Sequence, residues 1–379
     1  MATAGPRSSS GTSNRKPRIL FLAPRPYGTN PSQRFRFEQY LPILEARGYE
    51  VREEPFLDEA TVRLLSKPGH TREKVGGVLR GFARRMSVLR DARDFDFVFI
   101  HLEAAPVGPP IIEAVLFAMG KPVIYDIDDV MFVAKTQREN RLAAPFRFRS
   151  KVAWTAKRAR TVIGVNPFLV EWAGRHNRDT RLIPTTIDPA RHRPAPDRSE
   201  RGAGEVVRLG WTGSKTTAPY LDVAREALAE LDRTRDFTLR VICDHDPGFK
   251  LKRYEFVPWR EKTEIEDLWP IDVGIMPVKD DIVAKGKVGF KAIQFSALEI
   301  PCVVSDVGSG REVVEDGVTG LVVPNTVVDW VAALRRLIDD PALRRRMGCA
   351  ARERVLATYS VPAQTPNYLS LFEDEGMRP

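Results

Sequence analysis

The sequence predicts an α/β protein in which two doubly wound, parallel-sheet domains face each other across a cleft. Short apolar strands alternate with helices along most of the chain, which is typical of parallel sheets covered by helices on both faces. The alternation stops at 188–205, DPARHRPAPDRSERGAGE, which is rich in Pro, Arg and Gly, and it restarts at 206. A chain of 379 residues is also long enough for two domains of ordinary size.

In the first half, apolar strands and amphipathic helices follow one another in an order typical of a doubly wound sheet. A helix is predicted from 32 to 51, with Gly48 stopping it. The other predicted helices cover 71–93, 109–120, 146–159 and 168–176, and the predicted strands cover 18–26, 51–56, 95–102, 121–128, 161–165 and 181–185.

The second half repeats this order after the linker. Strands are predicted at 206–213, 237–243, 272–278, 301–306 and 320–323, and helices at 217–233, 291–299, 310–317, 327–340 and 341–359, with a short element near 263–269. We therefore expect a disordered tail (1–17), a first domain (18–187), a linker (188–205), a second domain (206–355) and a C-terminal segment (356–379) that returns to the first domain. Ligands of such sheets bind at the carboxyl ends of the strands, which places the site in the cleft.

The composition argues against several classes of protein. Cys243, Cys302 and Cys349 have neither paired nor metal-like spacing, which fits a reducing cytosol. No apolar run reaches the roughly 20 residues that span a bilayer, and the N-terminus lacks the apolar core of a secretory signal. The net charge of +9 favours acidic partners. Since basic residues are not interleaved with aromatic ones in a nucleic-acid module, phosphorylated small molecules and anionic lipid are expected rather than nucleic acid.

The segment GKVGFKAIQFSALEIPCVVSDVGSGREVVEDGVTGLVV resembles the nucleotide-sugar signature of family 4 retaining glycosyltransferases (glycosyl transferases group 1), which have the GT-B fold of two Rossmann-like domains. The resemblance covers roughly 206–360, and RLIDDPALRRRMGCAARERV is similar to that family's closing helices. The shared positions are Gly289, Ala297, Pro301, Val303, Val304, Gly308, Glu312, Asp316, Gly317, Gly320 and Leu321.

This resemblance implies a divergent member of the family, a hexosyltransferase-like enzyme of polysaccharide biosynthesis. Its expected reaction moves a sugar with retention from a nucleotide-diphosphate sugar to a saccharide or lipid-linked acceptor, with no cofactor. The alternatives on the same fold are a nucleotide-sugar epimerase or pseudoglycosyl coupling enzyme, and a catalytically weakened binding or scaffold subunit. The expected location is cytoplasmic, at the inner face of the cell membrane where the acceptor is lipid-linked.

The sequence departs from the family pattern at three positions. The two glutamates of the pattern fall on Gly286 and Gln294, and only Gln294 can still accept a hydrogen bond from a ribose hydroxyl. An arginine that clamps the diphosphate is replaced by Trp211. We expect the missing cation to come from lysines near the start of the predicted helix, because cations there favour a bound anion. The expected donor-binding residues are Gly213, Lys215, Lys285, Lys287, Gly289, Lys291, Gln294 and Glu312.

Three carboxylates lie within YDIDDVMF (125–132), at the end of a predicted strand. In the family this tip ends with a histidine beside the sugar, which aligns near Asp128. We therefore predict Asp128 and Asp126, with His101 at the neighbouring tip, as catalytic residues that orient a hydroxyl or stabilise positive charge at the anomeric carbon. One alternative is that Asp128 or Asp129 caps the following helix. The other is an Mg²⁺ or Mn²⁺ site, which the GT-B resemblance disfavours.

Two further segments of the first half are candidate contact surfaces. The loop PRPYGTNPSQRFR resembles the acceptor-side loop of the family, with Gly28, Arg34 and Arg36 as candidate contacts. The segment 78–93 has five arginines and one aspartate, with Val78, Phe82, Met86 and Leu89 at helical spacing. It can either lie on anionic lipid or pack its apolar stripe on the sheet, and packing is slightly favoured.

Overall fold

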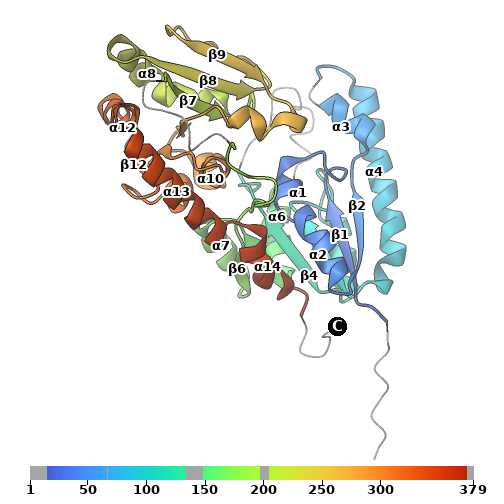
Figure 1. The fold of residues 1–379 in the computed structure, drawn as a ribbon. Helices are drawn as coiled ribbons and strands as arrows, with labels where there is room; N and C mark the ends of the chain where they lie inside the picture. Colours follow the sequence, from blue (N-terminus) through green and yellow to red (C-terminus); the bar gives the residue numbers. More distant parts are fainter. Residues whose placement is uncertain (1–14, 66, 134–147, 197–204, 374–379) are drawn as a thin grey trace, which may run out of the picture.

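The computed structural model describes residues 15–65, 67–133, 148–196 and 205–373, and it contains two six-stranded parallel sheets. The strand order is β2-β1-β3-β4-β5-β6 in the first sheet and β12-β11-β10-β7-β8-β9 in the second. Helices flank both sheets, and the two domains lie one above the other in Figure 1. This is the predicted fold class.

The first domain contains the predicted strands in the predicted order. They are β1 (Arg18–Ala23), β2 (Glu50–Pro55), β3 (Phe97–His101), β4 (Val123–Ile127), β5 (Thr161–Gly164) and β6 (Thr180–Leu182). Its helices are α1 (Pro31–Phe35), η1 (Glu38–Tyr40), α2 (Leu41–Ala46), α3 (Glu59–Leu65), α4 (Thr71–Asp91), η2 (Ala92–Asp94), α5 (Ile111–Ala118), α6 (Ser150–Arg158) and α7 (Pro167–Gly174).

The single helix predicted from 32 to 51 is wrong, because the segment forms α1, η1 and α2 in succession. Arg36 leaves the helical region at φ −105° and ψ −89°, and Asn30 caps α1 with its side chain. Pro42 lies in the first turn of α2, where a missing N–H costs nothing. The break turns the side chains of α1 into the core and toward the second domain.

The second domain contains one strand that the sequence pattern did not reveal. Its strands are β7 (Val207–Thr212), β8 (Phe237–Cys243), β9 (Tyr254–Pro258), β10 (Val273–Met276), β11 (Cys302–Ser305) and β12 (Gly320–Val323). Its helices are η5 (Ala218–Leu221), α8 (Asp222–Thr234), η6 (Glu261–Thr263), η7 (Glu266–Leu268), α9 (Ile282–Lys285), α10 (Phe290–Ala297), α11 (Gly310–Val313), α12 (Val327–Asp339) and α13 (Pro341–Thr358). The additional strand is β9 at the sheet edge, whose mostly half-buried side chains give little apolar signal.

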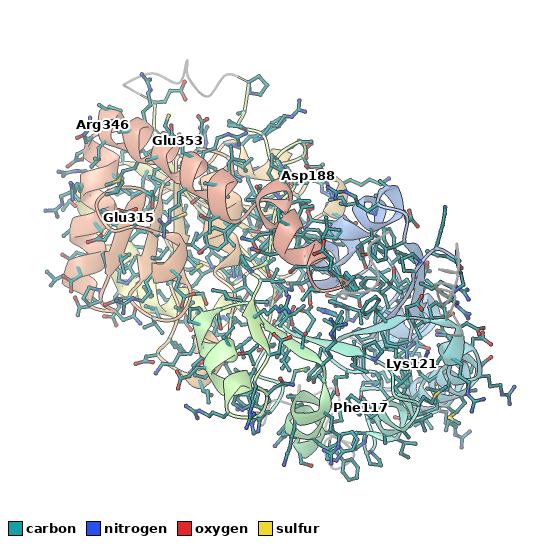
Figure 2. All side chains as sticks on the ribbon, turned by 90° about the horizontal axis from the view of Figure 1, so that it is seen from below. Phe117, Lys121, Asp188, Glu315, Arg346 and Glu353 are labelled. Atoms are coloured by element: carbon teal, nitrogen blue, oxygen red, sulfur yellow. The ribbon has the colours of Figure 1, made fainter. Side chains whose placement is uncertain are left out.

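The C-terminal helices connect the two domains. After α13, α14 (Val361–Leu369) packs on the first domain, where the rings of Tyr368 and Tyr40 stack with centroids 4.1 Å apart. Phe372 is fully buried in the same core as Phe21. The red helices in Figure 1 run from one domain to the other, and Figure 2 shows Arg346 and Glu353 along α13, with Asp188 near its far end.

The apolar stripe of α4 largely packs inward. Leu89 is buried, Val78 and Phe82 are partly buried against a small cluster around Phe56, and only Met86 of the predicted stripe is exposed. This arrangement matches the favoured alternative for 78–93, in which the stripe covers the sheet. Among the described residues, no helix is both long and apolar enough to cross a membrane.

Candidate active site

The carboxyl ends of β3 and β4 bring His101 and Asp126 side by side. The two residues are register partners in the parallel ladder, and both side chains are fully buried. Asp126 Oδ2 accepts a hydrogen bond from His101 Nδ1 at 2.7 Å. Because their strands are neighbours with the same direction, the two tips necessarily meet at one edge of the sheet.

Arg36 secures the buried end of this pair. Its guanidinium donates to both carboxylate oxygens of Asp126, through Nε at 3.3 Å and through Nη2, and Nη1 donates to the Ile183 carbonyl at 2.6 Å. Burial alone would raise the pKa of Asp126, but Arg36 and His101 lower it to about 2. Asp126 is therefore an anion that is held away from solvent, and its predicted role as a group touching substrate does not fit its position.

Asp128 is the less buried of the two predicted catalytic carboxylates at this strand tip. It is half-buried, and its Oδ2 accepts a hydrogen bond from the Ser32 hydroxyl. The same hydroxyl lies 2.8 Å from His101 Nε2. Burial raises the pKa of Asp128, with Asp126 and Asp129 adding to the rise, while His101 and Ser32 oppose it.

The alternatives for the acidic tip are constrained by these contacts. Asp129 Oδ1 accepts from the neighbouring Val130 N at 2.8 Å, which is a local turn contact and not a helix cap. The segment 134–147, where a capped helix would follow, lies outside the described residues. Among the residues described, no group of three or more His, Cys, Asp and Glu side chains has metal-site geometry.

Lys291 occupies the first turn of α10 and lies over the Trp211 ring, with Nζ 5.2 Å from the ring centroid. Trp211 is fully buried, and its ring fills the space beside Gly213, where a Cβ would come within 2.3 Å. Burial, with a smaller contribution from the charge of Lys287, lowers the pKa of Lys291 to about 8. The tryptophan that replaces a cation of the family pattern therefore supports one through a cation–π contact.

The other predicted donor-binding residues differ in their exposure and in their partners. Lys287 is half-buried and close enough to Lys291 to affect its charge, whereas the exposed Lys285 pairs with Asp280 at 3.1 Å. Lys215 is exposed on the loop after β7, and its backbone N–H donates to Asp244. The side chain of Gln294, on α10, is buried.

Glu312 and Gly289 line a separate cavity of about 190 Å³ between the domains, together with Tyr359 and Ile293. Burial raises the pKa of Glu312. Gly289 packs so closely on the Ser309 carbonyl that a Cβ would lie 2.9 Å from its oxygen. Glu312 thus lines this cavity beside the start of α10, whereas the side chain of Lys291 lies over Trp211.

The two domains contact each other beside the acidic tip. A Cβ at Gly286 would lie 2.2 Å from Val130 Cγ1, so the glutamate of the family pattern has no room there. Burial and the charges of Asp281 and Asp129 raise the pKa of Tyr220, on η5, to about 12. The acidic loop of the first domain therefore occupies the place where the second domain lacks its carboxylate.

Asn166 fastens the same interface and was not recognised from the sequence. Its Oδ1 caps α7, while Nδ2 donates to the Lys285 and Lys287 carbonyls at 3.1 and 3.2 Å and to Ser309 Oγ at 2.8 Å. An Asn followed by Pro167 signals a helix start. Nothing in the sequence indicates that its amide reaches the second domain.

The candidate acceptor contacts already have partners within the protein. Arg34 donates to both oxygens of Glu264 in the second domain, at 3.1 and 2.9 Å, and Arg36 is committed to Asp126. Both arginines are buried, so neither presents a free guanidinium to the cleft. Gly28 adopts φ +74°, which favours glycine, and its N–H donates to Glu38.

Comparisons with known proteins agree with this architecture. Residues 207–340 match the family described as "Glycosyl transferases group 1". A curated α-D-kanosaminyltransferase from Streptomyces kanamyceticus is 33% identical over 92 residues, which is 24% of each chain. A glycogen synthase from Mycobacterium tuberculosis is 26% identical over 55% of this chain and 52% of its own. The chain thus spans between a quarter and about half the length of these curated relatives.

Solved structures resemble the whole chain. Alr3699/HepE from Anabaena, in complex with UDP and glucose, has a TM-score of 0.66 and 16% identity over 93% of this chain and 99% of its own. A sucrose-phosphate synthase from Thermosynechococcus elongatus has a TM-score of 0.63 and 17% identity over 94% and 98%. At such low identity these likenesses establish the fold alone. The chain has the GT-B fold, and residues 207–340 of its second domain are similar to the glycosyl transferases group 1 family.

Proposed function

We propose that the protein transfers a sugar, with retention at the anomeric carbon, from a nucleotide-diphosphate sugar to a saccharide or lipid-linked acceptor. The observation that carries this proposal is the meeting of two chemistries at the domain interface. Lys287 lies just before α10 and Lys291 in its first turn, and Asp128 lies beside the contact between Val130 and Gly286. The diphosphate of the donor is an anion that needs nearby cations, and the positive charge that develops on the sugar needs a nearby carboxylate.

The lysines are suited to hold the diphosphate. Two ammonium groups lie close together, and the positive end of the α10 dipole adds to them. Burial makes the protonated form of Lys291 costly, so a bound anion would relieve that cost. In this proposal Lys291 and Lys287 neutralise the leaving nucleotide, with Lys215 as an exposed third cation and Gln294 toward the ribose.

Asp128 is suited to act on the sugar. The departure of the diphosphate leaves positive charge at the anomeric carbon, and a nearby carboxylate stabilises that charge. In a retaining reaction of this kind the donor phosphate itself accepts the proton of the acceptor hydroxyl. The remaining contribution of the chain is to position both substrates, since Asn166 and Arg34 hold the domains together at this point.

Nucleotide binding tests the donor half of the proposal. Since one structural neighbour is described with UDP and UDP-glucose, UDP heads a panel with GDP, ADP and TDP in a melting-temperature assay. We expect one nucleotide to raise Tm in the wild type and to raise it less in Lys291→Met. Stabilisation without turnover of any nucleotide sugar would favour a scaffold subunit, and conversion of the sugar without an acceptor would favour an epimerase. No shift with any nucleotide would contradict all of these functions.

We also propose peripheral contact with anionic lipid at the inner face of the cell membrane, made by α4. This proposal is supported by a row of exposed apolar side chains, Val75, Leu79 and Met86, which are 52%, 63% and 51% exposed and lie among exposed arginines. Such a surface suits a headgroup region. Leu79→Asp should reduce co-sedimentation with phosphatidylglycerol vesicles, and equal pelleting of the two proteins would contradict the proposal.

A further inference from the structure

Four side chains at the acidic tip form one continuous hydrogen-bonded chain. Asp126 Oδ2 lies 2.7 Å from His101 Nδ1, His101 Nε2 lies 2.8 Å from Ser32 Oγ, and the Ser32 hydroxyl contacts Asp128 Oδ2. One end is closed by Arg36, which pairs with Asp126 in the interior. The other end is the half-buried Asp128. The chain therefore connects a fully buried imidazole to a half-buried carboxylate.

The protons in this chain can be counted. If the Ser32 hydroxyl donates to Asp128, the contact with His101 requires that Nε2–H donate to Ser32 Oγ. The other nitrogen, Nδ1–H, donates to Asp126, which is an anion. Both ring nitrogens then carry a hydrogen, so His101 is an imidazolium and Asp128 is ionised.

A second arrangement uses the same heavy-atom positions. A protonated Asp128 donates to Ser32 Oγ, the Ser32 hydroxyl donates to His101 Nε2, and His101 is neutral with its hydrogen on Nδ1. The two arrangements differ by one proton, which leaves Nε2 for Ser32 while the original hydroxyl proton passes to Asp128. No bond between heavy atoms is made or broken, and the total charge is unchanged.

We propose that Ser32 relays a proton between Asp128 and His101, so that the buried histidine sets the charge of the half-buried Asp128 carboxylate. His101 is then a positioning and proton-storing residue that never touches the substrate. The relay itself depends only on the geometry. Its use in sugar transfer rests on the proposed function, in which an ionised Asp128 stabilises the positive charge at the anomeric carbon. When that charge develops, the proton moves to His101, and it returns afterwards.

The surroundings favour a shared proton over a permanently charged carboxylate. His101 is fully buried, and among its described hydrogen bonds Ser32 is the link to Asp128. Arg36, the residue after α1, lies at the inner end with Asp126 from β4 and Tyr368 from α14. Glu38 from η1 faces His101 and is also influenced by Arg34, and Asp129 faces Asp128. The carboxylates Asp126, Asp128, Asp129 and Glu38 outnumber the arginines Arg36 and Arg34 here, and protonation of either His101 or Asp128 offsets part of that negative charge.

Nitrogen NMR of the histidine rings tests the relay without any need for catalysis. The chain has five histidines, and His101→Gln identifies the resonances of His101. We expect the chemical shifts of the His101 ring nitrogens to change with pH in the wild type. In both Ser32→Ala and Asp128→Asn the curve of chemical shift against pH should differ from the wild-type curve. The exposed serine of α4 provides the control Ser87→Ala, which should reproduce the wild-type curve. Superimposable curves for all of these proteins would overturn the relay.

Kinetics then test whether the relay serves the reaction. Ser32→Ala should lower kcat by about 10²-fold, the scale of a lost proton-transfer contribution, leave KM within about twofold, and alter the pH profile of kcat. Ser32→Thr retains the hydroxyl and should recover most of the rate. Equal pH profiles for Ser32→Ala and the wild type would overturn the catalytic use. Coupled titration with no transfer from any donor would leave the relay standing and reject the proposed function.

Discussion

Gly286 in the second domain lies directly against Val130 in the first, so closely that a Cβ at Gly286 would lie 2.2 Å from Val130 Cγ1. Gly286 has an ordinary φ of −82° and is needed for space, not for an unusual backbone conformation. Val130 follows Asp128 and Asp129, so this contact fixes the distance between the acidic tip and the lysines at the start of α10. Val130, beside the acidic tip of the first domain, thus fills the space that the family glutamate would need at Gly286.

Gly286→Ala should therefore push the domains apart. We expect a rise in KM for the donor of about tenfold, since a misplacement of about 1 Å can cost more than that. Val130→Ala removes the clashing methyl groups, so the double variant Gly286→Ala/Val130→Ala should recover a near wild-type KM. A double variant as impaired as Gly286→Ala alone would show that the contact does not set the geometry. Steady-state kinetics with the best donor measure the effect.

The lowered pKa of Lys291 predicts a pH-dependent nucleotide affinity. Below about pH 8 the amine is protonated and attracts the diphosphate, and above it the free protein loses this charge. Affinity should therefore fall by no more than about twofold from pH 7 to 8 and more steeply above pH 8, a range in which the phosphates, with their last pKa at about 6, do not titrate. Calorimetric titration with the stabilising nucleotide at several pH values measures this.

Two lysine variants distinguish the titration of Lys291 from a general loss of positive charge as the cause of the pH dependence. Lys291→Met should weaken binding by about tenfold at pH 7, the cost of one hydrogen bond to a charged group, and should abolish the fall above pH 8. Lys287→Met removes the neighbouring charge that lowers the pKa of Lys291. The nucleotide affinity of this variant should therefore begin to fall at a higher pH than that of the wild type. A wild-type affinity that stays constant up to pH 10 would contradict the role given to Lys291.

The buried pair of Arg36 and Asp126 should contribute more to the free energy of unfolding than the more exposed ion pairs of the first domain. Arg36→Met leaves a buried carboxylate without its cation, which costs about 3–5 kcal/mol, whereas Arg52→Met breaks a more exposed pair and should cost about 1 kcal/mol or less. Urea unfolding followed by tryptophan fluorescence compares the two variants. Equal midpoints would contradict the assigned difference.

The same pair predicts the acid side of the stability curve. Folding lowers the pKa of Asp126 to about 2 from an ordinary value near 4, so the folded state binds its proton less tightly. The contribution of ionised Asp126 to the free energy of unfolding is complete above pH 4 and is lost as pH falls from 4 to 2. Asp126→Asn should flatten Tm against pH in that window, and a curve that matches the wild type would contradict the role of Asp126.

Much of the fold could be predicted because the parallel strands are short apolar runs. Runs such as 121–128 need only the alternation of strands and helices to be placed in a doubly wound sheet. The edge strand β9 escaped prediction because edge positions are only partly buried. The break between α1 and α2 escaped as well, since Arg36 and Gln33 point into the interior, where a polar side chain contradicts the usual helical pattern.

The candidate site could be predicted only as a set of strand tips. The sequence indicated that Asp126, Asp128 and His101 would lie near one another, but it could not show which of them is buried. That depends on Ser32 in α1 and on Arg36 directly after it, which lie about 90 residues away in the chain. Contacts between domains, such as those of Asn166 and Arg34, have no local pattern and become visible only in three dimensions.

Sugar transfer from a nucleotide-diphosphate donor, with the help of Asp128, is the proposal on which the other functional predictions depend. It is tested by turnover of a panel of nucleotide sugars with saccharide and lipid-linked acceptors, in the wild type and in Asp128→Asn. We expect transfer from one donor, and a loss of kcat of about 10²-fold or more in Asp128→Asn with an unchanged Tm. An Asp128→Asn protein that loses stability but keeps wild-type kcat would contradict the proposal, as would the absence of transfer from every donor.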